Sequence, residues 1–259
     1  MAKETRVALL DFGQMFAPEY MTAWNFPSAE IISMPTFGVL IDHEDGRYLF
    51  DTGFDLHFFQ TAVDPAGVSQ TVEQTVPGQL KMLGMSPDDI NYVVNSHYHF
   101  DHCGGNKHCR HAKTICHKCE LEAGQNPQPF ENFMYSDRSY QKSESTALDI
   151  YTPDFETLEG DQEIAAGVTL FETPGHSAGH YSLMVKLAGR RPMLFPADVV
   201  YSQKALDNMI LPASHLDPVR AYQSIERIKA LAEKHDAEIF FSHDAASFAN
   251  YKKAPSWYS

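Results

Sequence analysis

Short apolar runs separated by polar turns dominate the first fifty residues and predict β-structure. Residues 7–11 form the first run, and residues 36–41 and 47–50 form two more on either side of the turn at 44–46. The Asp45-Gly46 pair in that turn supplies the positive φ angles that tight hairpins need. The sequence therefore predicts a first strand followed by a β-hairpin.

Two later segments follow the helical period instead. Residues 217–235 predict a helix that begins with Asp217 as its N-cap and Pro218 in its first turn. One face of this helix carries the apolar residues Val219, Tyr222, Ile225, Ile228 and Leu231 with Ala232. Residues 70–84 also predict a helix, in which Pro77 favours a late start or a kink.

Residues 15–35 and 125–153 fit neither period. Both are rich in aromatic residues and interrupted by prolines, and both are long for connections within a compact domain. For any single Met or Phe in them, packing under a loop is the simpler interpretation. As segments, they are candidates for a lid or for the walls of a pocket.

Four further apolar runs each lead to a side chain that can bind a metal ion. The runs cover residues 92–96, 168–175, 192–197 and 238–242, and they are followed by His97, His176, Asp198 and His243. In α/β proteins, strand ends that face a common edge are where sites are placed. We therefore expect these four side chains to lie close together.

The segment His97-Tyr98-His99-Phe100-Asp101-His102 places four potential ligands within six residues. Imidazole and carboxylate groups suit Zn²⁺. His97 and His99 can share one ion while Asp101 and His102 face another, and the strand-end side chains are available to complete both sites. A single His is more often solvated or packed, but so dense a group predicts a metal centre.

Composition narrows the function further. The chain has 20 Lys plus Arg against 34 Asp plus Glu, a formal charge of −14, which disfavours nucleic acid and anionic lipid as partners. No apolar run approaches the roughly 18 residues of a membrane span, and the first residues lack a signal-peptide pattern. We therefore expect no membrane association and a cytoplasmic location. The length and the hydrophobic content of 43% are compatible with one domain over residues 1–259.

The four cysteines, Cys103, Cys109, Cys116 and Cys119, fall within seventeen positions. A structural zinc site is disfavoured because only one C-x₂-C pair is present. Free, buried thiols are expected, except that Cys103 directly follows a candidate ligand and is a candidate for the pocket wall. His180, four residues after His176, is expected to form hydrogen bonds rather than to bind metal.

Together these segments resemble the metallo-β-lactamase superfamily over about residues 36–244. The resemblance rests on H-x-H-x-D-H, Asp51-Thr52-Gly53, the run from Thr173 to His180, Asp198 and Phe241-Ser242-His243-Asp244. Asp198-Val199-Val200-Tyr201 is similar to the quorum-quenching N-acyl homoserine lactonases. Residues 95–107 and 126–130 are similar to lactonases that act on 4-pyridoxolactone. The resemblance implies an αββα sandwich of two mixed β-sheets flanked by helices.

The same resemblance implies two zinc ions per chain. One ion would be held by His97, His99 and His176, and the other by Asp101, His102 and His243. Asp198 would bridge the two ions, and Asp51 would orient a ligand from outside.

The implied reaction is hydrolysis of the ester bond of a small five-membered lactone, either of the 4-pyridoxolactone type or an N-acyl homoserine lactone. A metal-bridging hydroxide would attack the carbonyl carbon. Tyr201 would lie beside the carbonyl and help to hold the oxyanion, and Asp101 would return a proton to the leaving alcohol.

Other functions remain as alternatives. A glutathione-thioester hydrolase of the glyoxalase II type shares H-x-H-x-D-H, but that class generally carries a C-terminal helical domain, and only sixteen residues follow His243. A metallo-nuclease is disfavoured by the negative charge, and a true β-lactamase by the Asp101-His102 pair. A non-catalytic metal-binding or redox-sensing module would need a damaged ligand set, whereas this set is complete. The sequence leaves homo-oligomerisation and the identity of the native metal open.

Overall fold

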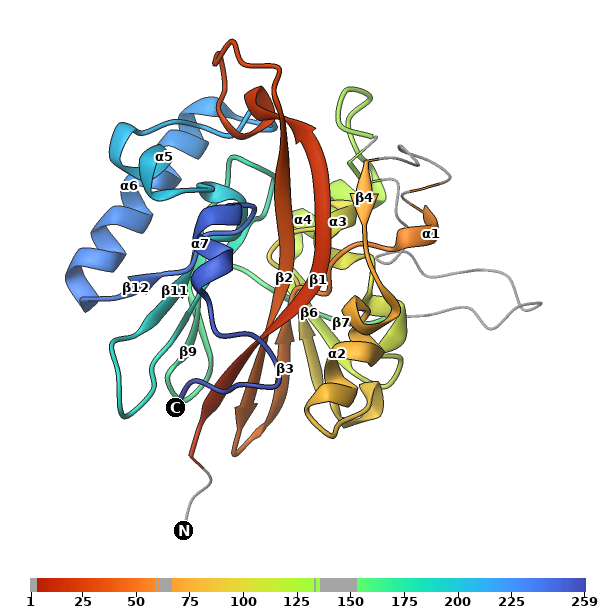
Figure 1. Ribbon diagram of the computed structural model, residues 1–259. Helices are drawn as coiled ribbons and strands as arrows, with labels where there is room; N and C mark the ends of the chain where they lie inside the picture. Colours follow the sequence, from red (N-terminus) through yellow and green to blue (C-terminus); the bar gives the residue numbers. More distant parts are fainter. Residues whose placement is uncertain (1–3, 59, 61–66, 133, 136–152) are drawn as a thin grey trace.

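The computed structural model describes residues 4–58, 60, 67–132, 134–135 and 153–259. Two mixed β-sheets pack face to face, with helices on both outer faces (Figure 1). The predicted αββα sandwich is therefore confirmed. Within the described ranges, no helix is both long and apolar enough to cross a bilayer.

The first sheet contains seven strands: β1 (Arg6–Pro18), β2 (Ile31–His43), β3 (Gly46–Phe50), β4 (Val68–Ser69), β5 (Tyr92–Val94), β6 (Lys113–His117) and β7 (Asp154–Leu158). Their order across the sheet is β4-β1-β2-β3-β5-β6-β7. The neighbours β4, β1, β2 and β3 are antiparallel, whereas β3, β5, β6 and β7 are parallel.

The second sheet contains five strands: β8 (Gln162–Ala165), β9 (Val168–Glu172), β10 (Tyr181–Val185), β11 (Met193–Phe195) and β12 (Glu238–Ile239). Their order is β12-β11-β10-β9-β8, and β11 with β12 is the parallel pair. Each of the four predicted runs thus contains a strand. Each strand ends three or four residues before its metal-competent side chain.

The α-helices are α1 (Leu56–Phe58), α2 (Val76–Met82), α3 (Phe100–Cys103), α4 (Lys118–Gln125), α5 (Gln203–Asn208), α6 (Pro218–His235) and α7 (Ala245–Asn250). Short 3₁₀ helices are η1 (Glu19–Thr22), η3 (Val72–Gln74), η4 (Pro87–Asp89), η5 (Asn106–His108) and η6 (Ala197–Val199). The start of α2 at Val76 places Pro77 in its first turn, so the late start is confirmed.

Alternation along β1 shows how the layers are built. Val7 and Leu9 point into the core between the sheets, whereas Ala8 and Leu10 pack towards α2 on the outer face. Since successive strand residues face opposite sides, a strand covered on both faces must be apolar throughout. On the other side of the sandwich, α5 and α6 cover the second sheet (Figure 1).

The helix α6 forms as predicted, but its buried face is only partly the predicted one. Asp217 caps it by accepting hydrogen bonds from the backbone N–H groups of residues 219 and 220. Val219 is 65% exposed and Tyr222 is 44% exposed, so their predicted burial is wrong. Small residues take their place: Ala221 is buried, and the Ser224 hydroxyl donates to the carbonyl of Pro174 at 2.7 Å. The helix therefore lies close against the segment that precedes His176.

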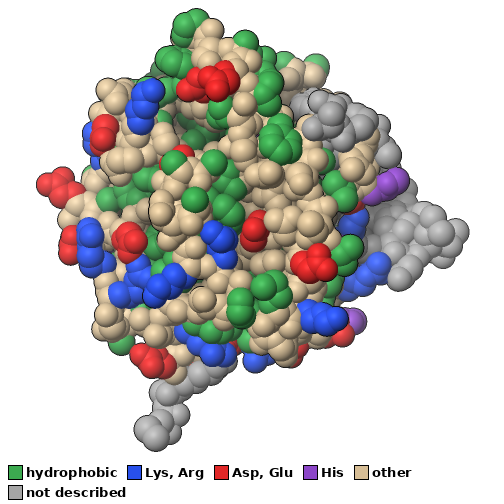
Figure 2. Space-filling model, viewed as in Figure 1, with side chains coloured by type: hydrophobic (Ala, Val, Ile, Leu, Met, Phe, Trp, Pro, Cys, Tyr) green, Lys and Arg blue, Asp and Glu red, His purple; other side chains and the backbone are tan. Residues whose placement is uncertain are grey.

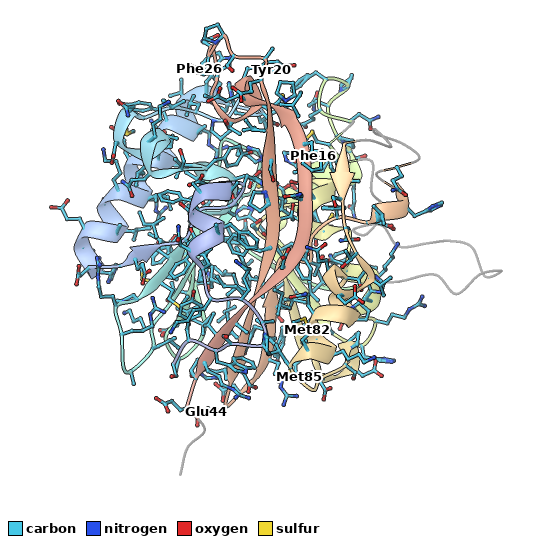
Figure 3. The ribbon with its side chains drawn as sticks, in the orientation of Figure 1. Phe16, Tyr20, Phe26, Glu44, Met82 and Met85 are labelled. Carbon is cyan, nitrogen blue, oxygen red and sulfur yellow. The ribbon has the colours of Figure 1, made fainter. Side chains whose placement is uncertain are left out.

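The interpretation of residues 15–35 as a connection is wrong at both ends of the segment, where residues 15–18 belong to β1 and residues 31–35 belong to β2. β1 and β2 continue their pairing as far as Pro18 opposite Ile31, beyond a bulge between Asp11 and Gln14. Pro35 is tolerated because β3 pairs only with residues 39–43, which leaves this part of β2 at an edge. The hairpin formed by β1 and β2 runs the height of the molecule. Its tip carries Tyr20 and Phe26, and Glu44 follows β2 at the opposite end (Figure 3).

The second unassigned segment is described only in part. Residues 133 and 136–152 lie outside the described residues, and residues 154–158 form β7 at the edge of the first sheet.

Candidate metal centre

The seven predicted ligands lie together in two groups, and all seven are buried. The histidine group consists of His97, His99 and His176. The mixed group consists of Asp101, His102, Asp198 and His243. Within each group the potential ligand atoms all lie within 4.8 Å of one another. The expectation that four strand ends converge is met, because loops after β5, β9, β11 and β12 supply the ligands.

Strained backbone marks two of these loops and the loop after β3. Asp51, Ala197 and His243 adopt left-handed conformations, with φ of 59°, 47° and 52°. Such conformations cost free energy for residues other than Gly, and they persist where the surrounding structure enforces them. Ala197 directly precedes Asp198, so the strain falls on segments that aim candidate ligands.

Three buried imidazole nitrogens lack a hydrogen-bond partner in the described part of the chain. They are the Nε2 atoms of His97, His102 and His243. A buried polar atom without a partner is costly, and the great majority are satisfied. These three atoms belong to the candidate ligands, and an imidazole nitrogen with a free lone pair can coordinate a divalent metal ion.

In four of the candidate imidazole ligands the Nδ1 atom contacts a hydrogen-bonding partner, and the contact of His102 is with Asp51. His97 Nδ1 lies 2.9 Å from the Ser96 hydroxyl, and His243 Nδ1 lies 3.0 Å from the carbonyl oxygen of Pro35. His176 Nδ1 lies 2.7 Å from the carbonyl oxygen at position 214. Partners on one ring nitrogen fix the tautomer and orientation that a metal-binding imidazole needs on the other.

Asp198 lies between the two groups and divides its oxygens between them. Oδ1 is 3.1 Å from His102 Nε2 and 3.3 Å from His243 Nε2. Oδ2 is 3.4 Å from His176 Nε2 and 4.0 Å from His97 Nε2. One carboxylate oxygen thus faces each group, which is the geometry that a bridging ligand requires.

Asp51 lies behind the mixed group. Its Oδ2 is 2.8 Å from His102 Nδ1 and accepts a hydrogen bond from the Ser96 hydroxyl at 2.7 Å. Its Oδ1 accepts from the backbone N–H of Ser96 at 2.8 Å. The predicted position of Asp51, outside the ligands and in contact with one of them, agrees with this geometry.

Tyr201 lies beside Asp198 and His243. Its hydroxyl donates to Asp198 Oδ2 at 2.9 Å, and its ring packs edge-on against His243 with centroids 5.0 Å apart. Burial raises the pKa of Tyr201 well above its usual value, and the neighbouring carboxylates act in the same direction. The phenol is therefore neutral and able to donate a hydrogen bond.

The electrostatics of the two groups differ. Burial lowers the pKa of His97 and His99 well below the usual value, and neighbouring imidazoles lower it further. For His102, burial also lowers the pKa, but the nearby carboxylates, Asp198 first, overcome it and raise the pKa well above the usual value. The histidine group therefore presents neutral rings, whereas the carboxylates of the mixed group favour the protonated ring of His102.

A cavity of about 390 Å³ lies beside Tyr201 and His243. Its other walls are Glu19, Thr22, Ile32, Ser33, Ser202, Asp244, Ala245 and Ala246. Four of these residues come from the segment 15–35, which agrees with its prediction as a pocket wall. Beyond the cavity, the hairpin tip exposes apolar side chains including Phe16, Tyr20 and Phe26 (Figures 2 and 3).

Several expectations about neighbouring residues can be compared with the structure. His180 hydrogen-bonds as expected: its Nε2 accepts from the backbone N–H of Asp198 at 3.2 Å, and its Nδ1 lies 2.9 Å from the Thr173 hydroxyl. All four cysteines are free, but Cys119 is exposed, so its predicted burial is wrong. Cys103 has no exposed surface and packs in an apolar cluster, so it does not line an open pocket wall.

Glu120 was not predicted as a site residue. This carboxylate is completely buried and accepts a hydrogen bond from the backbone N–H of Tyr98, which lies between the candidate ligands His97 and His99. The polar segment 118–125 also contains Glu122, and no local pattern distinguishes the two acids. Its burial depends on contacts between distant segments.

Comparisons with known proteins agree with this geometry. The family model described as "Metallo-beta-lactamase superfamily" matches residues 34–243. An N-acyl homoserine lactonase of Bacillus thuringiensis is 30% identical over 229 residues, which cover 83% of each chain. The N-acyl homoserine lactonase AttM of Rhizobium radiobacter is 29% identical over 268 residues, which cover 99% of each chain.

A solved N-acyl homoserine lactone hydrolase, with the product N-hexanoyl-L-homoserine at its catalytic metal center, has a similar fold. It superposes on this chain with a TM-score of 0.84 at 25% identity, covering 100% of both chains. The predicted resemblance to the superfamily and to its lactonase branch is confirmed.

Proposed function

The chain belongs to the metallo-beta-lactamase superfamily, and on this premise we propose that it is a dinuclear zinc lactonase. The observation that carries the proposal is the position of Asp198, with one oxygen facing His97 and His176 and the other facing His102 and His243. The relatives and the solved neighbour, named as lactonases and a lactone hydrolase, support the same reaction class.

In this proposal each group holds one zinc ion, and Asp198 contributes to both. Bound zinc supplies a water of lowered pKa as nucleophile and polarises the ester carbonyl. The protein's own part is to orient the imidazoles, through the Nδ1 contacts of His97, His176 and His243. Burial of the whole ligand set keeps bulk water away and strengthens every electrostatic contact inside it.

Two residues have further roles in the proposed reaction. Tyr201 is neutral and lies beside His243 at the cavity, so its hydroxyl can turn from Asp198 to a developing oxyanion. Asp101 lies 3.4 Å from His243 Nε2 and 3.5 Å from His102 Nε2. From there its carboxylate can carry a proton to the oxygen of the leaving alcohol.

N-acyl homoserine lactones are the first candidate substrates because the named relatives and the solved neighbour act on this class. A compact lactone of the 4-pyridoxolactone type is the second, and one observation favours it. The cavity wall beside Tyr201 includes the polar side chains of Glu19, Ser33, Ser202 and Asp244. These side chains could hydrogen-bond to polar groups on a small ring.

A substrate panel tests this proposal directly. We would compare kcat/KM for 4-pyridoxolactone, for short- and long-chain N-acyl homoserine lactones, for nitrocefin and for a glutathione thioester. We expect ring opening of at least one five-membered lactone and negligible hydrolysis of nitrocefin. If the thioester exceeded every lactone, the lactonase proposal would be wrong and the glyoxalase II alternative would replace it.

We also propose that residues 1–259 act as one hydrolase domain, since loops from both sheets supply the ligands. A cytoplasmic location and the absence of nucleic acid partners stay predictions from composition.

A further inference from the structure

Glu120 is a buried carboxylate that the proposed reaction does not use. It lies in the first turn of α4 and has no exposed surface. Its Oε1 accepts hydrogen bonds from the backbone N–H of Tyr98 at 2.9 Å and from the hydroxyl of Tyr135 at 3.1 Å. Its Oε2 accepts from the backbone N–H of Gly179 at 2.9 Å. A buried acid is costly unless its hydrogen bonds compensate, so this geometry calls for an explanation.

The donors to this carboxylate belong to the segments that carry the histidine group. Tyr98 directly precedes His99, and Gly179 follows His176 by three residues. The ring of Tyr135 packs edge-on against the His99 ring, with centroids 5.2 Å apart. One side chain therefore ties together the two loops that bring the histidine group into place.

The approach of the His176 loop to α4 is close. A Cβ added at Gly179 would lie 2.5 Å from His117 Nδ1 and 2.6 Å from the backbone nitrogen of Glu120. Both distances are too short for a real Cβ atom, so the loop can reach the carboxylate only because this position is Gly.

The mixed group is held by different residues. His102 Nδ1 lies 2.8 Å from Asp51 Oδ2, and His243 Nδ1 lies 3.0 Å from the carbonyl oxygen of Pro35. These supports come from the loop after β3 and from β2, whereas Glu120 comes from α4.

We propose that Glu120 is a positioning residue that sets the spacing of the histidine group and thereby its affinity for a metal ion, but not the affinity of the mixed group. The inference rests on the proposed function only for the presence of two metal sites. Loss of one acceptor oxygen leaves a buried N–H or O–H without a partner, and one loop is then free to shift relative to the other.

The test is a metal titration with matched variants. E120Q and D51N each replace a buried carboxyl by an amide of the same size, one behind each group. Zn²⁺ added to metal-free protein in competition with a chromophoric chelator resolves the two binding steps. His99→Ala and His243→Ala, which each damage one group, identify the step that belongs to each.

We expect E120Q to weaken the histidine-group step about 10- to 100-fold and to change the other step by less than about threefold. D51N should weaken the mixed-group step more than the histidine-group step, because Asp51 contacts His102 directly and His97 only through Ser96. Equal weakening of both steps by E120Q, or an effect of E120Q on the mixed-group step alone, would overturn the proposal. A lower Tm of metal-free E120Q with both steps unchanged would also overturn it, because it would show a general packing role.

Tyr135→Phe keeps the carboxylate and removes a single donor, so it decides the question if E120Q does not fold. We expect a smaller weakening of the same step, and no change in either step would contradict the proposal. No lactone enters these titrations. A failed lactone panel together with a selective loss of one step would therefore refute the proposed function and leave this inference intact.

Discussion

The histidine group and the mixed group face each other across Asp198, yet they are supported in different ways. In the histidine group, burial and neighbouring imidazoles keep the pKa values of His97 and His99 low. In the mixed group, burial lowers the pKa of His243, but Asp198 and other carboxylate contacts raise it to about 9. Neutral rings therefore form one half, and rings that favour the protonated state beside carboxylates form the other.

This difference shows that two adjacent metal sites can depend on different kinds of support. The rings of the histidine group make hydrogen bonds with neutral partners, such as the Ser96 hydroxyl and the carbonyl oxygen of Ser214. Placement of the mixed group relies on a carboxylate, Asp51, and on mutual attraction between its own members. We expect geometry to limit metal affinity at the first site and charge to limit it at the second.

The largest effect is expected from the residue that both halves share. Asp198→Asn should lower kcat/KM by about a thousandfold or more, because it weakens the hold on both ions, which together supply several kcal/mol of transition-state stabilisation. It should also reduce the rise in Tm on adding Zn²⁺, since ions bind only the folded state. Kinetics and thermal melts with and without Zn²⁺ would check this. Near-normal turnover of the variant would show that Asp198 does not bridge.

The next effect separates the two halves. Protein purified without a chelator should contain close to two equivalents of metal, mostly zinc, by elemental analysis, because two complete ligand groups are present. His99→Ala and His243→Ala should each lower this toward one equivalent and abolish measurable turnover. A reproducible value of one in the fully active unmodified protein would contradict the dinuclear proposal.

A smaller effect is expected from Tyr201 at the cavity, because its substitution should affect the reaction but not metal binding. Tyr201→Phe should lower kcat by about ten- to a hundredfold, less than the loss of a dedicated oxyanion donor, because bound ions carry most of the polarisation. Metal content should stay the same, which distinguishes this variant from those of the two groups. Unaltered turnover would show that Tyr201 is a packing residue.

The smallest effect is expected from the thiols, which lie outside both groups. Burial raises the pKa of Cys109 and of Cys116 to about 12, so little thiolate forms near pH 8, whereas Cys119 is exposed. A thiol reagent at pH 8 should therefore modify the native protein fastest at Cys119, as peptide mapping would show. Replacing Cys109 and Cys119 together by Ser should leave metal content and turnover unchanged. Loss of a third zinc equivalent would instead indicate a structural site.

The chemistry of the centre could be predicted from the sequence because its signals are local. Four ligands lie within six residues, and the other three follow apolar runs, so residue type and spacing alone indicated which side chains would meet. The two-sheet sandwich followed from the same runs together with the resemblance that the motifs carry.

What the sequence did not predict depends on contacts between distant segments. The carbonyl of Pro35 that orients His243 is a backbone group without a sequence signature, and it is 208 positions away along the chain. Glu120 resembles any surface acid until Tyr98 and Gly179 approach it. Val219 and Tyr222 were predicted to be buried but are exposed on α6. The small residues Ala221 and Ser224 are buried instead, because the segment at Pro174 and Gly175 approaches this part of the helix closely. The sequence by itself determined the candidate ligands, since residue type and spacing indicate their chemistry. The tertiary structure decided what holds them, because a hydrogen bond between remote segments exists only once the layers have packed.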